Sequence, residues 1–226
     1  MSLVIENLKT IILLNPKCGS RTLLKLFSNI CSPKDLERYK ILEGATKNLD
    51  HLTLSETQSF FANNFINISD YSVIICIRNP LDRVYSYYLE LKNLKILPKD
   101  WYFRNFDYQF DRNLSYIIDN INNISLNDFV HLEYFDNLTQ RFCFENMTYT
   151  TSNFKKINII KLENFEQDLK NLGYVFNEMF RENSSEILFK ISKKGLNISN
   201  LFTESSRKII KNYCKSDIIA GNYNIE

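Results

Sequence analysis

The sequence has almost no excess of charge of either sign. Its 28 basic side chains nearly balance 26 acidic ones, which gives the 226-residue chain a formal net charge of +2 at pH 7. Nucleic-acid-binding domains usually carry a strong basic excess. We therefore expect no nucleic-acid partner, and any anion must be bound by locally placed groups. The length suits one sizeable domain, and we predict a single domain over residues 1–226.

Long hydrophobic runs and paired cysteines are also lacking. No stretch approaches the roughly 18 apolar residues of a membrane-spanning helix. Residues 1–7 have neither the basic flank nor the long apolar run of a signal peptide. The five cysteines are scattered and form no C-x-x-C pair, which disfavours a zinc site and a disulfide framework. These absences predict a cytoplasmic protein with no membrane span and no bound metal.

The most informative segment that is present covers residues 11–24. Four apolar residues at 11–14 predict a short buried strand, and Leu23 begins an apolar rhythm typical of a helix. The loop between them contains Pro16 and Gly19. A strand, a loop and a helix in this order direct backbone N–H groups and the positive end of a helix dipole at one point. This arrangement favours an anion site.

The side chains of the loop are compatible with such a site. Lys17 supplies a mobile positive charge, Gly19 allows close approach of the backbone to a ligand, and Ser20 and Thr22 offer hydroxyls. The loop is not a Walker A motif, because it has a single glycine and its lysine precedes that glycine. A nucleoside triphosphate with Mg²⁺ is therefore not the expected ligand. The alternative is an ordinary strand-to-helix turn with a solvated lysine and a capping serine.

A second apolar strand is predicted at residues 73–77. A capping-box pattern at 53–56 opens a helix that we expect to reach about residue 65, between the two strands. Two buried strands joined by a crossover that contains a helix favour a parallel sheet covered on both sides.

The residues after the second strand suggest another anion site. Arg78 stands at the carboxyl end of the strand, and Pro80 suits the first turn of a helix that carries Ser86. Ligands of open α/β sheets bind outside the carboxyl ends of the strands. We therefore expect Arg78 and Ser86 to hold a second anion beside the first. The alternative is an arginine paired with Asp82 and a serine in solvent.

These two segments resemble a known family. The sequence P-K-C-G-S-R-T at 16–22 resembles the 5′-phosphosulfate loop of sulfotransferases that use 3′-phosphoadenosine 5′-phosphosulfate (PAPS). R-N-P-x-x-R-x-x-S-x-Y at 78–88 resembles their 3′-phosphate loop, and residues 193–199 resemble a basic loop near the nucleotide. The similarity is closest to carbohydrate (Golgi-type) sulfotransferases and their bacterial relatives. It spans most of the chain, for which we expect no amino-terminal membrane anchor like that of the Golgi members.

The resemblance implies a P-loop-like three-layer α/β sandwich, in which helices flank a central, mainly parallel sheet. It implies transfer of a sulfuryl group from PAPS to a hydroxyl of a carbohydrate acceptor, with 3′,5′-adenosine bisphosphate as the product and without a metal. The donor-binding residues that it implies are Lys17, Cys18, Gly19, Ser20, Arg21, Thr22, Arg78, Ser86 and Lys194.

A hydroxyl acceptor needs a proton acceptor, and the chain has only two histidines. His51 falls between the two anion loops, where some family members place a catalytic histidine, so we predict His51 and Lys17 as the catalytic residues. We expect His131 to be structural or on the acceptor side. Glu56 and Glu133 are the carboxylate alternatives, and either would need a raised pKa.

Two further questions stay open at the level of sequence. The aromatic residues of 101–110 form either an acceptor-binding face or core under an insertion, and 137–142 is a candidate for acceptor contacts. The alternative functions are a non-catalytic nucleotide- or glycan-binding module on the same fold and a P-loop-like nucleotide kinase. The absence of a Walker A motif argues against the kinase.

Overall fold

A four-stranded mixed sheet lies at the centre of the fold, in the order β1-β2-β3-β4. The computed structural model describes residues 2–37, 51–63, 67, 70–94, 112–136, 143–150, 154–174 and 197–225. The strands are β1 (Ser2–Ile5), β2 (Thr10–Leu13), β3 (Ser72–Ile77) and β4 (Lys156–Lys161). β2, β3 and β4 run parallel, whereas β1 is antiparallel to β2.

Both predicted strands are present, and the α/β class is confirmed. The apolar run at 11–14 forms β2, which begins and ends one residue earlier, and the run at 73–77 forms β3. The parallel order holds for β2–β3 and β3–β4, but β1 departs from it. The turn at 6–9, where Lys9 has a φ of 45°, sends the chain back along β1 as an antiparallel hairpin. The sequence analysis did not predict this edge strand.

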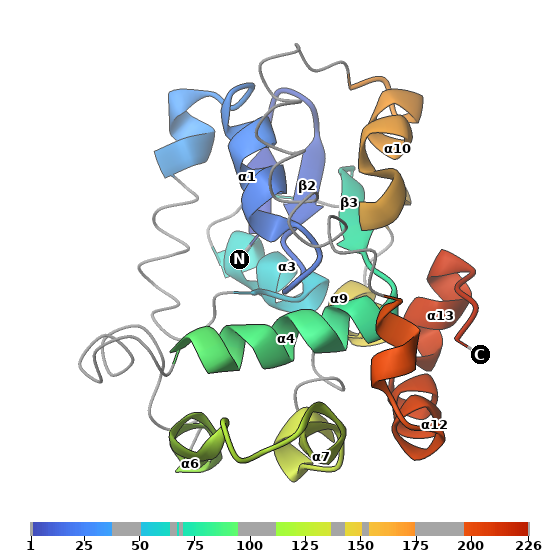
Figure 1. Cartoon of the computed structure of the whole chain (residues 1–226). Helices are drawn as coiled ribbons and strands as arrows, with labels where there is room; N and C mark the ends of the chain where they lie inside the picture. The colour runs from blue at the N-terminus through green and yellow to red at the C-terminus, as the bar shows by residue number, and fades with distance from the viewer. Residues whose placement is uncertain are drawn as a thin grey trace.

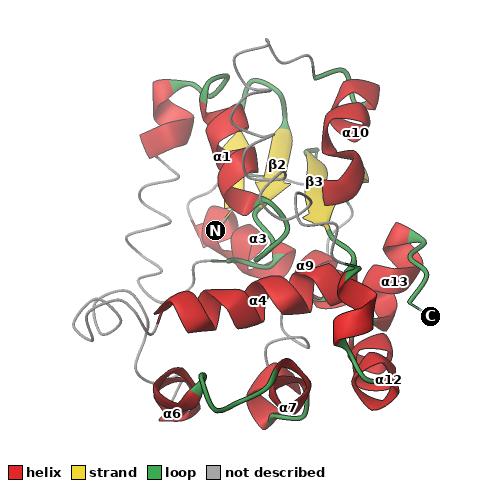
Figure 2. Cartoon of the chain, in the orientation of Figure 1, coloured by secondary structure: helices red, strands yellow, loops and turns green. Residues whose placement is uncertain are grey.

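Helices cover both faces of the sheet (Figures 1 and 2). One face packs on α1 (Ser20–Ser28) and α10 (Phe165–Asn171), and the other packs on α3 (Leu54–Asn63) and α9 (Phe144–Thr148). Successive residues of β3 alternate between these faces, because side chains along a strand point to opposite sides. Ile74 and Cys76 join the first cluster, whereas Val73 and Ile75 join the second. This two-sided burial explains why the strands read as continuous apolar runs.

The long helix α4 (Pro80–Leu94) crosses the end of the sheet at which β2 and β3 finish (Figure 1). Beyond it lie α6 (Arg112–Asn120) and α7 (Leu126–Val130), and α12 (Glu204–Tyr213) packs on α4 and α7. α4 thus separates the carboxyl end of the sheet from a second group of helices.

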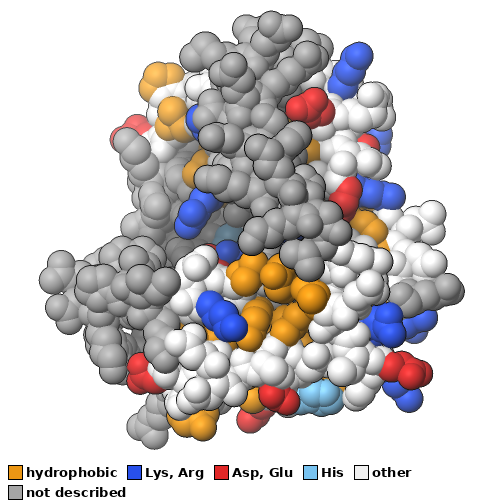
Figure 3. Space-filling view, viewed as in Figure 1, with side chains coloured by type: hydrophobic (Ala, Val, Ile, Leu, Met, Phe, Trp, Pro, Cys, Tyr) orange, Lys and Arg blue, Asp and Glu red, His pale blue; other side chains and the backbone are white. Residues whose placement is uncertain are grey.

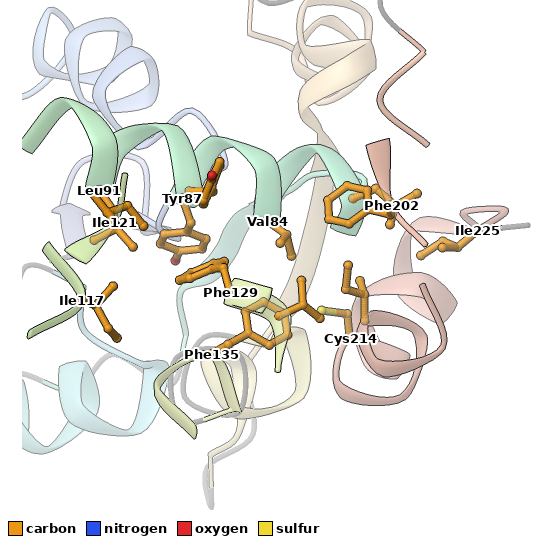
Figure 4. Close-up of a cluster of buried hydrophobic side chains, with 14 of the residues drawn as sticks. Val84, Tyr87, Leu91, Ile117, Ile121, Phe129, Phe135, Phe202, Cys214 and Ile225 are labelled. Carbon is orange, nitrogen blue, oxygen red and sulfur yellow. The ribbon is translucent and has the colours of Figure 1, made fainter. Parts of the chain in front are cut away.

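The face of α4 that meets these helices forms an apolar cluster of its own (Figure 4). Leu81, Val84 and Tyr88 are buried there, and Tyr85 is half-buried against it. Other members labelled in Figure 4 are Tyr87, Leu91, Ile117, Ile121, Phe129, Phe135, Phe202, Cys214 and Ile225.

Two predicted helix starts are confirmed. Thr53 N donates to Glu56 Oε2 at 2.7 Å, and Glu56 N donates to Thr53 Oγ1 at 3.2 Å, which is the reciprocal pattern of a capping box. α3 covers Leu54–Asn63, and the expected end near residue 65 lies outside the described residues. α4 begins at Pro80, where proline's fixed φ suits the first helical position and its missing N–H costs nothing.

In the described parts of the chain, every helix is too short or too polar to traverse a lipid bilayer. On the face shown in Figure 3, the described basic and acidic side chains are interspersed, in keeping with the small net charge. The described residues also contain no group of three or more His, Cys, Asp or Glu side chains arranged to hold a metal ion.

A buried ion pair connects α4 to the C-terminal helix α13 (Lys215–Gly221). Arg83 Nη1 lies 3.0 Å from Asp217 Oδ1, and both side chains are almost fully buried. Asp217 Oδ2 also accepts from Phe144 N at 3.1 Å. Because each charge has left water, each depends on its partner for compensation.

We expect Asp217→Asn to destabilise the protein by about 3 to 5 kcal/mol, because it leaves the Arg83 charge buried without its counter-charge. Urea unfolding at pH 7 measures the change. Lys34→Met is the matched control, since the exposed Lys34–Glu6 pair has a separation of 3.8 Å and such pairs contribute about 1 kcal/mol or less. Similar small losses in both variants would show that the buried pair does not stabilise the fold.

Candidate functional site

The two predicted anion loops meet at one edge of the sheet. β2 and β3 are parallel neighbours, so their carboxyl ends lie side by side. β2 leads through Asn15 into the loop at 16–19, and Arg78 directly follows β3. Arg78 Nη1 donates to Lys17 O at 3.3 Å. The structure therefore brings Lys17 and Arg78 into direct contact, although 61 positions separate them in the sequence.

The backbone of the first loop takes left-handed conformations at two residues. Lys17 has a φ of 59°, and Gly19, the N-cap of α1, has a φ of 78°. A Cβ atom added to Gly19 would lie 2.7 Å from Leu162 Cδ1. The dihedral angle of Gly19 therefore favours glycine, and a larger residue would also require the Leu162 side chain to move. Ser20 is the first helical residue and not the cap, which removes the capping-serine alternative.

The start of α1 remains compatible with an anion. Its N-cap is a glycine without a side-chain hydrogen bond, and its first turn contains no acidic residue. The first N–H groups of a helix have no partner within the helix and lie at the positive end of its dipole. Ser20 and Thr22 are half-buried beside them, and Arg21 is exposed.

Cys18 differs from its neighbours in the loop. Its thiol is fully buried in the core, and burial raises the thiol's pKa to about 11. Its backbone N–H donates to Asn15 O at 3.3 Å. The Cys18 side chain therefore packs in the core beneath the loop, and its N–H forms a hydrogen bond within the chain.

The side chain of Lys17 is paired and only partly exposed to solvent. Its Nζ forms an ion pair with Glu90 Oε1 of α4. Burial lowers the pKa of Lys17, and the charges of Arg21 and Arg78 lower it further, whereas Glu90 raises it. Sequence analysis did not identify Glu90, because nothing local indicates that the third turn of α4 reaches the loop after β2.

α4 also presents Ser86 to this region. Residues four apart on a helix share a face, so Asp82, Ser86 and Glu90 form one stripe, and Glu90 fixes its direction toward Lys17. Burial raises the pKa of Asp82, Arg78 lowers it and Glu163 raises it. Ser86 therefore lies between two carboxyl groups, an arrangement that the sequence motif alone did not reveal.

A second contact anchors the exit of β2 to α4. Arg83 Nη2 donates to Asn15 Oδ1 at 3.2 Å, and Asn15 Nδ2 donates to Cys76 O at 3.5 Å. Together with the Arg83–Asp217 pair, these bonds fix the exit of β2 against β3, α4 and α13.

His51 lies at the same edge of the sheet, as its position between the loops predicts. Its Nδ1 is hydrogen-bonded to Leu14 O. Because a carbonyl only accepts, Nδ1 carries the proton and Nε2 is the ring nitrogen able to accept one. Burial lowers the pKa of His51 to about 3, and the positive charges of Arg83 and Lys17 add to this effect. The ring is therefore neutral at pH 7.

The other candidate bases lie elsewhere or have another role. Glu56 caps α3 through its bond to Thr53 N. His131 is the exposed C-cap of α7, and Glu133 is exposed shortly after it. α7 packs on α4 and α12.

Beside Arg78 the surface has an open, polar pocket. Its lining comes from the start of α4 and from two later segments, with Asn79, Leu81, Asp82, Asn197, Ile198, Ser199 and Asn224. Glu163 braces this region, because it accepts from Asn79 N at 2.7 Å and from Tyr223 Oη at 2.9 Å. The described end of the predicted basic loop, residues 197–199, thus lies next to the second anion loop. Lys194 and the segments 101–110 and 137–142 lie outside the described residues.

No protein-family model, curated protein or solved structure gives a significant match to the chain. The resemblance to PAPS-dependent sulfotransferases therefore rests on the sequence motifs alone.

The lowered pKa of His51 predicts a pH-dependent stability. The folded state binds no proton on His51 above about pH 3, whereas an unfolded histidine binds one below about pH 6.5. The free energy of unfolding should therefore fall as the pH drops from 6.5 toward 3. Between pH 6.5 and 5, we expect the free energy of unfolding of His51→Gln to fall by about 1 kcal/mol or more less than that of the wild type.

Urea unfolding at both pH values measures the effect, with His131→Gln as the control. Carboxylates that titrate in this range contribute equally to both variants, so the difference between the variants isolates His51. Equal pH slopes for the two variants would contradict a neutral, buried His51.

Proposed function

We propose that the chain binds PAPS across the Lys17 and Arg78 loops and transfers its sulfuryl group to a hydroxyl of a carbohydrate. The observation that supports this most is the contact between Arg78 and the Lys17 carbonyl at the adjacent ends of two parallel strands. PAPS carries a 5′-phosphosulfate and a separate 3′-phosphate, so its donor site needs two neighbouring cationic anchors. Helices on both faces of the sheet are compatible with the P-loop-like sandwich that the resemblance implies.

In this proposal the first loop holds the 5′-phosphosulfate. Lys17 and the N–H groups at the start of α1 stabilise the negative charge that grows on the bridging oxygen as the S–O bond breaks. The hydroxyls of Ser20 and Thr22 add hydrogen bonds, and Arg21 adds charge from the exposed side. The loop is preorganised by Gly19, so little reorganisation is needed when the donor binds.

Arg78 and Ser86 hold the 3′-phosphate at the start of α4. The guanidinium of Arg78 has five N–H donors, and its bond to Lys17 O occupies one of them. The role of Lys194 stays a prediction, because this residue lies outside the described part of the chain.

His51 is the proposed proton acceptor. The acceptor hydroxyl gives its proton to Nε2, its oxygen forms the new bond to sulfur, and the bond from sulfur to the bridging oxygen breaks. A pKa of about 3 makes the ring a weak base before the donor arrives. A bound phosphosulfate adds negative charge nearby, which raises a histidine's pKa toward the working range.

The low pKa of His51 favours one alternative, a non-catalytic nucleotide- or glycan-binding module on the same fold. A nucleotide kinase is less well supported, because the loop lacks the Walker A pattern that holds Mg²⁺ and a triphosphate.

Donor binding is tested by calorimetry with 3′,5′-adenosine bisphosphate and with ATP–Mg²⁺. We expect the bisphosphate to bind more tightly, and Lys17→Ala and Arg78→Ala each to weaken it about tenfold or more, since each removes a charge-assisted contact. Lys25→Ala, on the exposed last turn of α1, is the control. Tighter binding of ATP–Mg²⁺, or unchanged binding by the Arg78 variant, would contradict the two-anion site.

Catalysis is tested by the transfer of labelled sulfate from PAPS to a panel of glycans. We expect Lys17→Ala and Arg78→Ala to abolish transfer. His51→Ala should lower turnover about a hundredfold or more, the usual contribution of a general base, and spare the binding of the bisphosphate. Unchanged turnover would assign the base to another residue. Donor binding without transfer to any glycan would favour the non-catalytic module.

A further inference from the structure

Two residues of the continuous segment formed by β3 and α4 contact Lys17. Arg78, at the end of β3, donates to the backbone carbonyl of Lys17, and Glu90, on the helix that follows, pairs with its ammonium group. The backbone contact positions the loop. The side-chain contact draws the ammonium toward α4 and supplies it with an anion.

This ion pair is partly withdrawn from water. The side chains of Lys17 and Glu90 are 20% and 39% exposed. Charges in such a site interact more strongly than fully exposed ones, because less water screens them. An ammonium has three N–H donors, so Lys17 can contact a second anion, but that anion would then lie close to the Glu90 carboxylate and be repelled by it.

Resting on the function proposed above, we propose that Glu90 is a built-in competitor for Lys17, which the 5′ anion of the donor must displace to bind. Glu90 thereby sets the affinity of the first anion loop and leaves the Arg78 subsite unaffected. Binding a donor then exchanges one anionic partner of Lys17 for another, and the released carboxylate turns toward solvent, to which it is already partly exposed.

The exchange predicts a selective gain of affinity in Glu90→Gln. This variant keeps the size of the side chain and removes its charge. We expect 3′,5′-adenosine bisphosphate and 5′-AMP to bind about tenfold more tightly, and 3′-AMP, which has no 5′ anion, to bind as in the wild type. Calorimetry measures all three ligands. Glu166→Gln, an exposed position on α10, makes the same change of net charge and should alter none of them.

Lys17→Met tests whether Glu90 acts through Lys17. If Glu90 acts through Lys17, the gain from Glu90→Gln disappears when it is combined with Lys17→Met. The NMR titration of the Lys17 ammonium gives a readout that needs no ligand. The pKa of Lys17 should fall in Glu90→Gln, because Glu90 is the group that raises it.

The outcomes separate the two proposals. If the bisphosphate binds the wild type but Glu90→Gln binds it no more tightly, the competition is overturned while the donor site stands. If no adenine nucleotide binds the wild type or Glu90→Gln, both the proposed function and the competition are wrong. This holds even if the pKa of Lys17 falls in Glu90→Gln, because that fall shows only the ion pair. Binding that appears only in Glu90→Gln supports both.

Discussion

The site depends on the buried guanidinium of Arg83. Of the charged groups on α4, it lies deepest, and it binds both the exit of β2 through Asn15 and the C-terminal helix through Asp217. A buried charge tolerates few positions of its partners, because a lost contact leaves it uncompensated in a medium of low dielectric. Arg83 therefore fixes α4 across the end of the sheet. With α4 in this place, Arg78 reaches the carbonyl of Lys17, and Glu90 reaches its ammonium.

The parts of the fold that local sequence determines were predictable. β2 and β3 are short apolar runs because both of their faces are buried, and α3 and α4 begin at a capping box and a proline that act over a few residues. β1 was not predictable in the same way. Its antiparallel pairing depends on the turn at 6–9 and on a place beside β2, and neither gives a distinctive pattern in four residues.

The same distinction applies to the site. Lys17 and Arg78 were expected to meet because each follows a buried strand, and parallel neighbours end at one edge. Glu90, Asp217 and Glu163 were missed, since their contacts join segments brought together only by tertiary packing; Arg83 and Asp217 are 134 positions apart. The position of His51 followed from the order of the motifs. Its low pKa did not, because burial and the charges of neighbouring elements cause it.

The charges around the loop are nearly balanced before any ligand binds. Lys17 is paired with Glu90, Arg83 is paired with Asp217, and Arg78 lies near Asp82. A site compensated in this way attracts anions less strongly than its basic residues suggest, since each new anion also meets a carboxylate. The attraction that remains comes from fixed dipoles, namely the N–H groups at the start of α1, which no acidic residue in the first turn opposes. In the function proposed above, the two anionic groups of the donor contact these dipoles and Arg78. The carboxylates, which the basic motifs do not reveal, therefore oppose that binding and belong in any account of the donor's affinity.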